Sequence, residues 1–303
     1  MDKDIIKSGV LGFCISDALG VPVEFKSREY LKKEPVTDME GFGTNMQPKG
    51  SWSDDSSMAL CTLESLTECK GVDCINIADK FCKWCFEDYM TPKDEAFDCG
   101  NTVYQALTQY VSNKKISPQT DEYSNGNGSL MRILPLAFYL SVKPENKDEI
   151  IKEVSSITHG HQLSILGCQI YVTVAINLIN GAGKIKAIEE AMREYKGREE
   201  YGRYSRIADT DKFMRLGEDE IRSSGYVVDT LEASLWCFLN TATYKECVLK
   251  AVNLGDDTDT TATVAGGLAG IFYGRKSIPE EWISALRKHD MIENLCEDFA
   301  EEF

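Results

Sequence analysis

Apolar residues recur at spacings of three and four along nearly the whole chain, and this is the period of an α-helix. Residues 6–14 and 231–239 show the pattern most clearly. No stretch alternates apolar and polar side chains as a half-buried strand would. Only 8 of the 303 residues are proline, the residue that most strongly interrupts a helix. The sequence therefore predicts an all-α protein of about a dozen helices.

The expected helices cover residues near 6–14, 57–69, 74–89, 103–111, 130–141, 148–157, 162–180, 184–195, 231–239, 245–253, 258–273 and 279–289. Between them, residues 34–53 are predicted to form a loop, and residues 196–226 a charged surface excursion. Because no linker, repeat or low-complexity tract divides the chain, we expect a single-domain orthogonal bundle over residues 1–303. Its centre should hold the uniformly apolar helix 162–180 and the glycine- and alanine-rich helix 258–273.

The chain has 49 acidic and 33 basic residues, which gives a net charge of −16. This charge opposes binding to a phosphate backbone or an anionic membrane, so nucleic acid is an unlikely partner and no membrane partner is expected. The N-terminus lacks the features of a signal peptide, and the longest apolar run, residues 170–179, is about half the roughly 20 residues that a membrane span needs. We expect a cytoplasmic protein. Cys82 and Cys85 form a CxxC motif without the second half of a zinc site, so buried thiols are expected there.

Two of the predicted core helices begin with clusters of carboxylates. Ser53, Asp54 and Asp55 precede the first, and Asp257, Asp259 and Thr260 open the second. Capping of free backbone N–H groups explains one or two such side chains. The crowding of acids without a nearby lysine or arginine instead indicates a divalent cation, and Mg²⁺ and Mn²⁺ both accept carboxylate and hydroxyl oxygens. Neither segment has the register of an EF-hand calcium loop.

A third segment, residues 12–25, ends the first predicted helix. Gly20 suits a left-handed helix cap, and Pro22 prevents the helix from continuing. Glu24 should therefore lie in a loop just beyond the helix, where it could act as a mobile ligand. Asp17, inside the helix, is expected to be a structural hydrogen-bonding group.

Together these three segments resemble the ADP-ribosylglycohydrolase family, and the resemblance covers most of the chain. The family's GDxxG element, with a glutamate seven residues after the aspartate, is similar to residues 16–24, with Ser16 in place of the first glycine. Its W-[ST]-D-D-[TS] element is similar to residues 52–56, and its G-G-D-T-D-T element to residues 255–260, with Asp256 in place of the second glycine. The resemblance implies a central cleft with two Mg²⁺ or Mn²⁺ ions, and Glu24 beside them. The implied metal ligands are Ser53, Asp54, Asp55, Asp257, Asp259 and Thr260.

Further stretches extend this resemblance to the substrate. Residues 124–132 are similar to the family's NGxxMRxxP element, and Thr158-His159 to its T-H pair. Both are implied to face the diphosphate of ADP-ribose, and a glycine- and asparagine-rich loop does present backbone N–H groups to anions. Asp98 resembles an aspartate near the scissile bond, and Tyr226 a tyrosine that contacts the nucleotide. The implied substrate-binding residues are Gly100, Asn101, Ser124, Asn125, Gly126, Asn127, His159 and Tyr226.

The resulting hypothesis is a metal-dependent hydrolase that removes ADP-ribose from a protein or from a small conjugate. ADP-ribosyl-arginine is the expected substrate. The family's serine-directed relatives show an aromatic residue near Asn125 for adenine stacking, and the residue here is not aromatic, which weakens a serine-directed assignment. The implied catalytic residues are Glu24, Asp55 and Asp98, with Glu24 or Asp55 as the base and Asp98 as the acceptor of the departing guanidinium. Two alternatives stay open: a non-catalytic ADP-ribose-binding or structural relative, and a metal-dependent phosphoester hydrolase.

Overall fold

The structure is a computed structural model that describes residues 2–303, and this part of the chain contains no β-sheet. Its fifteen α-helices are α1 (Lys3–Gly20), α2 (Arg28–Lys33), α3 (Asp54–Cys69), α4 (Cys74–Glu87), α5 (Asn101–Asn113), α6 (Pro135–Val142), α7 (Lys147–Ser155), α8 (Gln162–Ile179), α9 (Lys184–Glu194), α10 (Thr210–Met214), α11 (Val227–Leu239), α12 (Tyr244–Val252), α13 (Thr258–Tyr273), α14 (Glu280–Ala285) and α15 (His289–Glu302). Short 3₁₀ helices, including Val21–Val23 and Glu199–Ala208, connect several of them. The predicted all-α class is confirmed.

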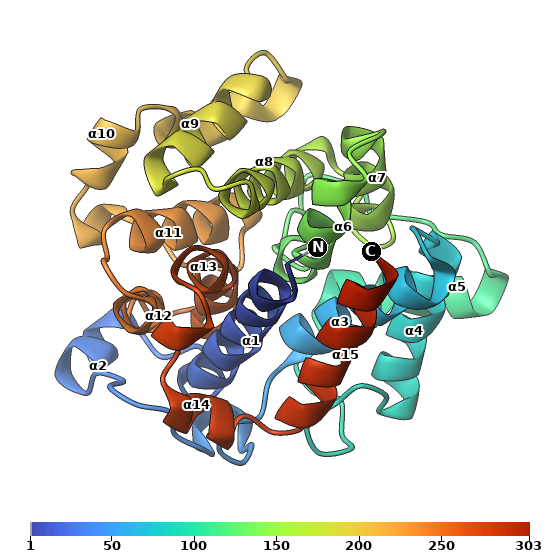
Figure 1. Ribbon diagram of the computed structural model, residues 1–303, viewed down its shortest axis with the longest axis horizontal. Coiled ribbons are helices and arrows are strands. Elements are labelled where there is room, and N and C mark those ends of the chain that lie inside the picture. The colour runs from blue at the N-terminus through green and yellow to red at the C-terminus, as the bar shows by residue number, and fades with distance from the viewer. Residues whose placement is uncertain (1) are drawn as a thin grey trace.

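Helices α1 and α13 lie side by side at the centre of the bundle (Figure 1). Small residues permit this close approach: a methyl group added to Gly12 would lie 2.8 Å from the carbonyl oxygen of Gly266, and one added to Gly270 would lie 2.2 Å from that of Ser8. The glycines of α13 lower the intrinsic stability of this helix, but they allow it to pack densely against the backbone of α1. The prediction that residues 258–273 form a core helix is confirmed.

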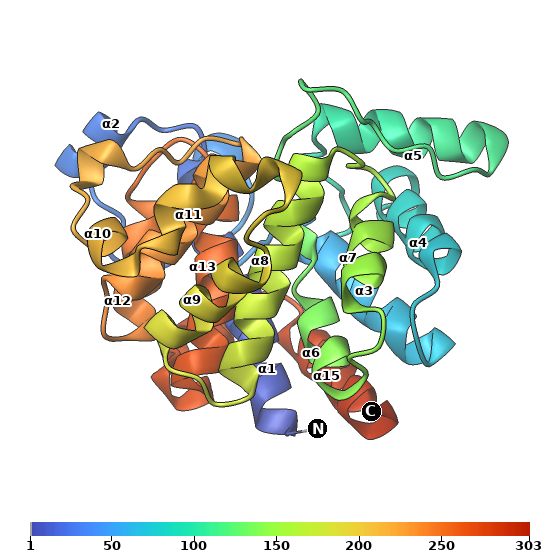
Figure 2. The ribbon, with the colours of Figure 1, turned by 90° about the horizontal axis from the view of Figure 1, so that it is seen from above.

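Helix α8 runs through the middle of the molecule in Figure 2, with α9 to α13 on one side of it and α3 to α7 on the other. Fourteen of its residues are buried, as its uniformly apolar sequence predicts. By length and composition alone, α8 and the segment Lys3–Val23 would be able to cross a membrane. The other helices nevertheless bury 78% of the residues in the α8 window and 89% of those in the Lys3–Val23 window, as expected of core helices.

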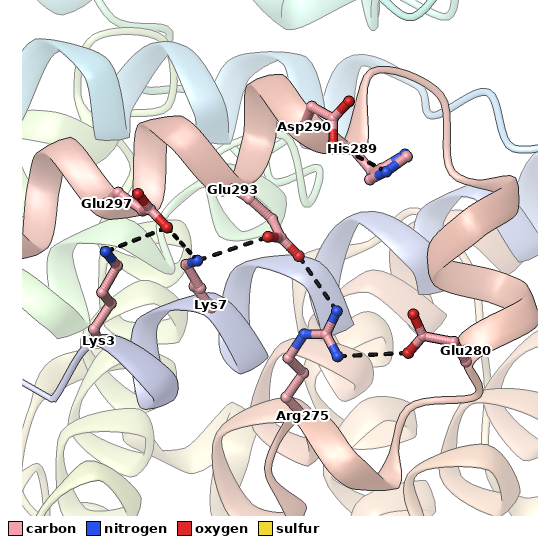
Figure 3. Close-up of polar contacts among 8 residues, drawn as sticks. All are labelled: Lys3, Lys7, Arg275, Glu280, His289, Asp290, Glu293 and Glu297. Atoms are coloured by element: carbon pink, nitrogen blue, oxygen red, sulfur yellow. Dashed lines mark hydrogen bonds and ion pairs between the residues drawn. The ribbon is translucent and has the colours of Figure 1, made fainter.

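A row of ion pairs fastens the C-terminal helix α15 to α1 (Figure 3). The ammonium group of Lys7 lies between the carboxylates of Glu293 and Glu297, at 3.6 and 2.5 Å. Arg275 contacts Glu293 from the other side, at 3.5 Å. On its buried face, α15 also packs Ile292, Cys296 and Phe299 into the core.

The structure differs from the sequence prediction in several places: α2 was not predicted, and the predicted helix 279–289 is only the short α14. The predicted helix 130–141 is divided into a 3₁₀ turn and α6, because Pro135 has no N–H to continue a helix but fits the first turn of a new one. Helix α15 was missed, although its buried residues recur at the expected spacing of three and four. Residues 196–226 are not only a surface excursion, since their short helices bury Tyr204, Ile207 and Phe213.

Candidate active site

The amino terminus of α3 is one wall of the site, and a buried carboxylate beneath it fixes its position. Asp17 on α1 accepts hydrogen bonds from the backbone N–H groups of Ser53 and Ser56 and from the Ser56 hydroxyl. Ser53 caps the helix by accepting from the N–H of Asp55, at 3.3 Å. Burial raises the pKa of Asp17 to about 6, although these hydrogen bonds act in the opposite direction. Asp17 is thus the structural group that the sequence predicts.

The amino terminus of α13 forms the facing wall. The Thr258 hydroxyl donates to the carbonyl oxygen of Gly20 at 2.9 Å, which joins the start of α13 to the end of α1. Gly20 is helical, with φ of −80°, so the predicted left-handed cap is wrong. Its lack of a side chain is required for another reason: a methyl group there would lie 2.3 Å from the Cα atom of Asp259. Gly20 therefore lets the α1 backbone approach the acidic end of α13.

The two acidic helix termini meet. The Thr260 hydroxyl lies 3.4 Å from Oδ1 of Asp55, so a residue of α13 contacts a residue of α3 that is 205 positions earlier in the chain. Asp257, on the same side as Thr260, accepts a hydrogen bond of 2.8 Å from the Asn127 side chain. The structure thus brings the two predicted ligand clusters to one place.

Two further carboxylates complete this acidic cluster. Oxygen atoms of Glu24, Asp98 and Asp259 all lie within 4.8 Å of one another, close enough for one cation to contact all three. Glu24 follows the turn Val21–Val23 and accepts a hydrogen bond from the Asn45 amide. Asp98 comes from the loop between α4 and α5, where it adopts the left-handed backbone conformation with φ of +63°. The acidic cluster therefore consists of six carboxylates from four parts of the chain. They are Glu24 after α1, Asp54 and Asp55 at the start of α3, Asp98 between α4 and α5, and Asp257 and Asp259 at the start of α13.

The electrostatics of the cluster are those of a site for cations. None of its carboxylates forms an ion pair with a basic side chain within residues 2–303. Burial and then the neighbouring Asp98 raise the pKa of Glu24 to about 8, and burial and then Asp257 raise that of Asp98 to about 6. Burial also raises the pKa values of Asp54, Asp55, Asp257 and Asp259. In Asp55, moreover, Oδ2 is buried without a hydrogen-bond donor. Oxygen donors with uncompensated charge suit Mg²⁺ or Mn²⁺.

A cavity of about 260 Å³ opens beside the acidic cluster. The sequence-predicted residues that line it are Glu24, Asp54, Asp98, Gly100, Asn101, Gly126, Asn127, His159, Asp257 and Thr260. Ser53 and Asp55 lie behind the wall of the cavity and are almost fully buried. The remaining residues that line the cavity were not named as site residues by the sequence analysis: Phe25, Thr102, Val103, Gly128, Met131 and Gly225. The sequence analysis also missed Asn45, which holds Glu24. A signal existed for Gly128 and Met131, which lie within the motif of residues 124–132, but none marked Asn45.

The glycine-rich loop reaches the cavity because a second segment holds it in place. The N–H of Asn127 donates to the carbonyl oxygen of Gly225, and that of Val227 to the carbonyl oxygen of Asn125, at 3.0 Å each. Gly126 and Asn127 line the cavity, whereas Ser124 and Asn125 do not. The Ser124 hydroxyl donates to the exposed Asp121 of the same loop, and the Asn125 side chain accepts from the Ser164 hydroxyl on α8. Tyr226 is half-buried at the start of α11 and pairs with Gly126 through its backbone.

His159 is held by a chain of hydrogen bonds that starts at a buried guanidinium. Arg132 is fully buried without a carboxylate partner, and it donates to the Thr158 hydroxyl at 2.9 Å. The Thr158 oxygen in turn lies 2.7 Å from Nδ1 of His159, and its hydroxyl has no other acceptor within the described residues. We therefore assign the hydroxyl hydrogen to this bond and the ring hydrogen to Nε2. Burial and the charge of Arg132 lower the pKa of His159 to about 3. The ring is therefore a neutral donor at the cavity.

Comparisons with known proteins agree with this geometry. The family model described as ADP-ribosylglycohydrolase matches residues 2–303. The ADP-ribosylarginine hydrolase Tri1 of Serratia proteamaculans is 32% identical over 295 residues, which cover 97% of this chain and 78% of that protein. The ADP-ribosyl-[dinitrogen reductase] glycohydrolase of Rhodospirillum rubrum is 30% identical over 278 residues, which cover 91% of this chain and 88% of that protein.

A solved structure titled "ADP-ribosylglycohydrolase-related protein complex" superposes with a TM-score of 0.85 at 29% identity, and the match covers 99% of this chain and 98% of that one. The sequence match and the structural match thus both extend over almost the full chain. They agree with the acidic cavity built from α1, α3 and α13. We conclude that the chain belongs to the ADP-ribosylglycohydrolase family and is a hydrolase of glycosidic bonds.

Proposed function

We propose that this protein removes ADP-ribose from arginine side chains with the aid of divalent cations, and so restores the unmodified target protein. The observation that carries the proposal is the meeting of Glu24, Asp98 and Asp259 beside a cavity with a glycine-rich loop and a histidine donor on its other side. The names of the relatives from Serratia proteamaculans and Rhodospirillum rubrum support arginine and a protein target.

The residues proposed to hold two Mg²⁺ or Mn²⁺ ions are Ser53, Asp54, Asp55, Asp257, Asp259 and Thr260. The support is chemical: these are oxygen donors, they are buried, and no basic side chain compensates their charge. Such ions supply positive charge that orients the ribose hydroxyls and lowers the pKa of water. Oxygen atoms of Asp98, Glu24 and Asp259 lie within 4.8 Å of one another, which makes Asp98 a further candidate ligand.

Glu24 is the better candidate for the base. It lines the cavity, whereas Asp55 lies behind the wall and forms no part of the lining. In the proposed reaction, a water oxygen forms a bond to the C1″ carbon of the ribose, and the bond from C1″ to the guanidinium nitrogen breaks. The base accepts the proton from the water, and the departing arginine side chain gains one proton on its nitrogen.

Asp98 is proposed to receive the departing guanidinium. Its carboxylate borders the cavity, and a planar guanidinium with several N–H groups makes strong charge-assisted contacts with a carboxylate. On the other side of the cavity, the Nε2–H of His159 and the backbone of Gly126 and Asn127 are placed to bind the diphosphate. Together these contacts would hold the scissile bond over the acidic cluster.

The proposal is tested by supplying ADP-ribosyl-arginine to the purified protein after its metals have been removed with EDTA and Mg²⁺ or Mn²⁺ has been restored. We expect free ADP-ribose, and slower release from serine- and nucleic-acid-linked conjugates. Release of AMP would instead indicate a phosphoester hydrolase, and binding of ADP-ribose without turnover would indicate a non-catalytic relative. Asp259→Asn should abolish turnover, and the matched control Asp298→Asn, which changes an exposed carboxylate on α15, should retain it.

A further inference from the structure

Two cysteine side chains meet beside the cavity. Cys85 lies near the end of α4, and Cys99 lies in the following loop, between Asp98 and the cavity residue Gly100. Their sulfur atoms are 3.7 Å apart. All eleven cysteines are free thiols, and no other two of them are in contact within the described residues. The proposed reaction uses neither sulfur atom, so their contact needs a separate explanation.

The distance between the two sulfurs is within reach of a disulfide. A disulfide bond is about 2.05 Å long, so the sulfurs need to approach by about 1.7 Å. Cys85 is fixed on α4, which is anchored by the buried side chains of Phe81 and Trp84. The backbone of residues 97–99, in contrast, makes no hydrogen bond to any other residue in the described chain. Closure should therefore move Cys99 toward α4 and leave the helix in place.

The neighbour of Cys99 would move with it. Asp98 is joined to Cys99 by a single peptide bond, and its carboxylate lies within 4.8 Å of those of Glu24 and Asp259. A shift of about 1.7 Å is large compared with the precision of about 0.5 Å that catalytic groups require. We propose that Cys85 and Cys99 are a modification site, at which a peroxide forms a disulfide that draws Asp98 away from the acidic cluster and stops hydrolysis.

The oxidation takes two steps. The sulfur of Cys85 attacks one peroxide oxygen, the O–O bond breaks, and a sulfenic acid forms while the other oxygen leaves as water or an alcohol after gaining a proton. The sulfur of Cys99 then attacks the oxidised sulfur, the S–O bond breaks, and the hydroxide leaves as water with the thiol proton. The two thiols lose two electrons, which the peroxide accepts. A hydrogen bond from Cys99 lowers the pKa of Cys85, which favours Cys85 as the first sulfur to react.

Cys82 provides the matched control. It lies on α4 three residues before Cys85 and is half-buried in the same way, but its sulfur contacts no other thiol in the described residues. The CxxC motif of the sequence is therefore not the reactive pair. The partner of Cys85 comes from the next loop.

The test uses the full-length protein, treated with hydrogen peroxide, blocked with iodoacetamide and digested with trypsin without reduction. Trypsin separates the two cysteines into peptides 84–93 and 94–114, which contain one cysteine each. We expect mass spectrometry to find these peptides linked. Hydrolysis of ADP-ribosyl-arginine should fall at least tenfold on oxidation and recover with dithiothreitol. Cys85→Ser should keep its basal activity and resist peroxide, whereas Cys82→Ser should respond as the wild type does.

Failure to find the linked peptides after oxidation would overturn the proposal, as would a linked protein with undiminished activity or a Cys85→Ser variant as sensitive as the wild type. The activity measurement rests on the proposed function, whereas detection of the disulfide does not. A reduced wild-type protein that fails to hydrolyse ADP-ribosyl-arginine would refute the proposed function, and the mass spectrum would then still decide whether the thiols form a bond.

Discussion

The acidic cluster should destabilise the protein when no metal is bound, and the effect should depend on pH. In the folded chain the pKa of Glu24 is about 8, against an ordinary value of 4.5, and that of Asp98 is about 6, against 3.8. As the pH rises, the unfolded chain therefore releases these protons before the folded chain does. The free energy of unfolding therefore falls as the pH rises from about 4 to about 8, as it must when folding raises the pKa of a carboxyl group.

The size of the effect follows from the same values. The shift of Glu24 alone corresponds to about 5 kcal/mol of unfolding free energy, at about 1.4 kcal/mol per pKa unit. An unfolding entropy of about 2.1 cal/mol/K per residue gives roughly 0.6 kcal/mol/K for this chain. In EDTA, the melting temperature should therefore fall by several degrees, and by up to about 8 °C, between pH 5 and pH 8. Mg²⁺ at about one hundred times its Kd should restore about 2.7 kcal/mol, or roughly 4 °C.

Differential scanning fluorimetry across this pH range, in EDTA and in Mg²⁺, measures both effects. Asp259→Asn removes one buried carboxylate, so we expect it to raise the melting temperature in EDTA at pH 8 and to lose the gain from Mg²⁺. Asp298→Asn removes the same formal charge from an exposed position and should do neither. A melting temperature in EDTA that is constant or rises with pH would refute the reasoning, as would an Asp259→Asn variant that melts lower than the wild type.

Three other predictions test separate parts of the structure. Asp98→Asn should lower kcat by about 10²-fold or more with little change in KM, measured by steady-state hydrolysis of ADP-ribosyl-arginine. Gly20→Ala should lower the melting temperature and the activity together, because its methyl group meets the backbone of Asp259, whereas Gly202→Ala, which has open space, should do neither. Arg132→Met should lower the free energy of unfolding, measured by urea denaturation, by about 3–5 kcal/mol. The reason is that the carbonyl oxygen of Gly128 and the hydroxyl of Thr158 lose the N–H donors of Arg132. A loss below about 1 kcal/mol would contradict this.

Most of the helices could be predicted from local sequence, because the apolar spacing of three and four records which face of each helix is buried. This apolar spacing was harder to recognise in segments rich in charged residues, such as α15 and the short helices between residues 199 and 214. There, a few buried side chains such as Tyr204 and Phe299 hold an otherwise polar surface to the core. Gly20 shows a different limit. A glycine near a helix end favours a left-handed cap by local rules, but here the close approach of another helix requires it.

The sequence by itself determined the helical class, the two core helices and the positions of the acidic residues that resemble a known family. These features depend on neighbours within a few residues along the chain. Only the tertiary structure decided that Asp55 lies behind the cavity wall while Glu24 lines it, that Asn45 holds Glu24, and that Cys85 meets Cys99 and not Cys82. The physical reason is that such contacts depend on how distant helices pack, and packing is fixed by the shape of the whole core and not by any local pattern.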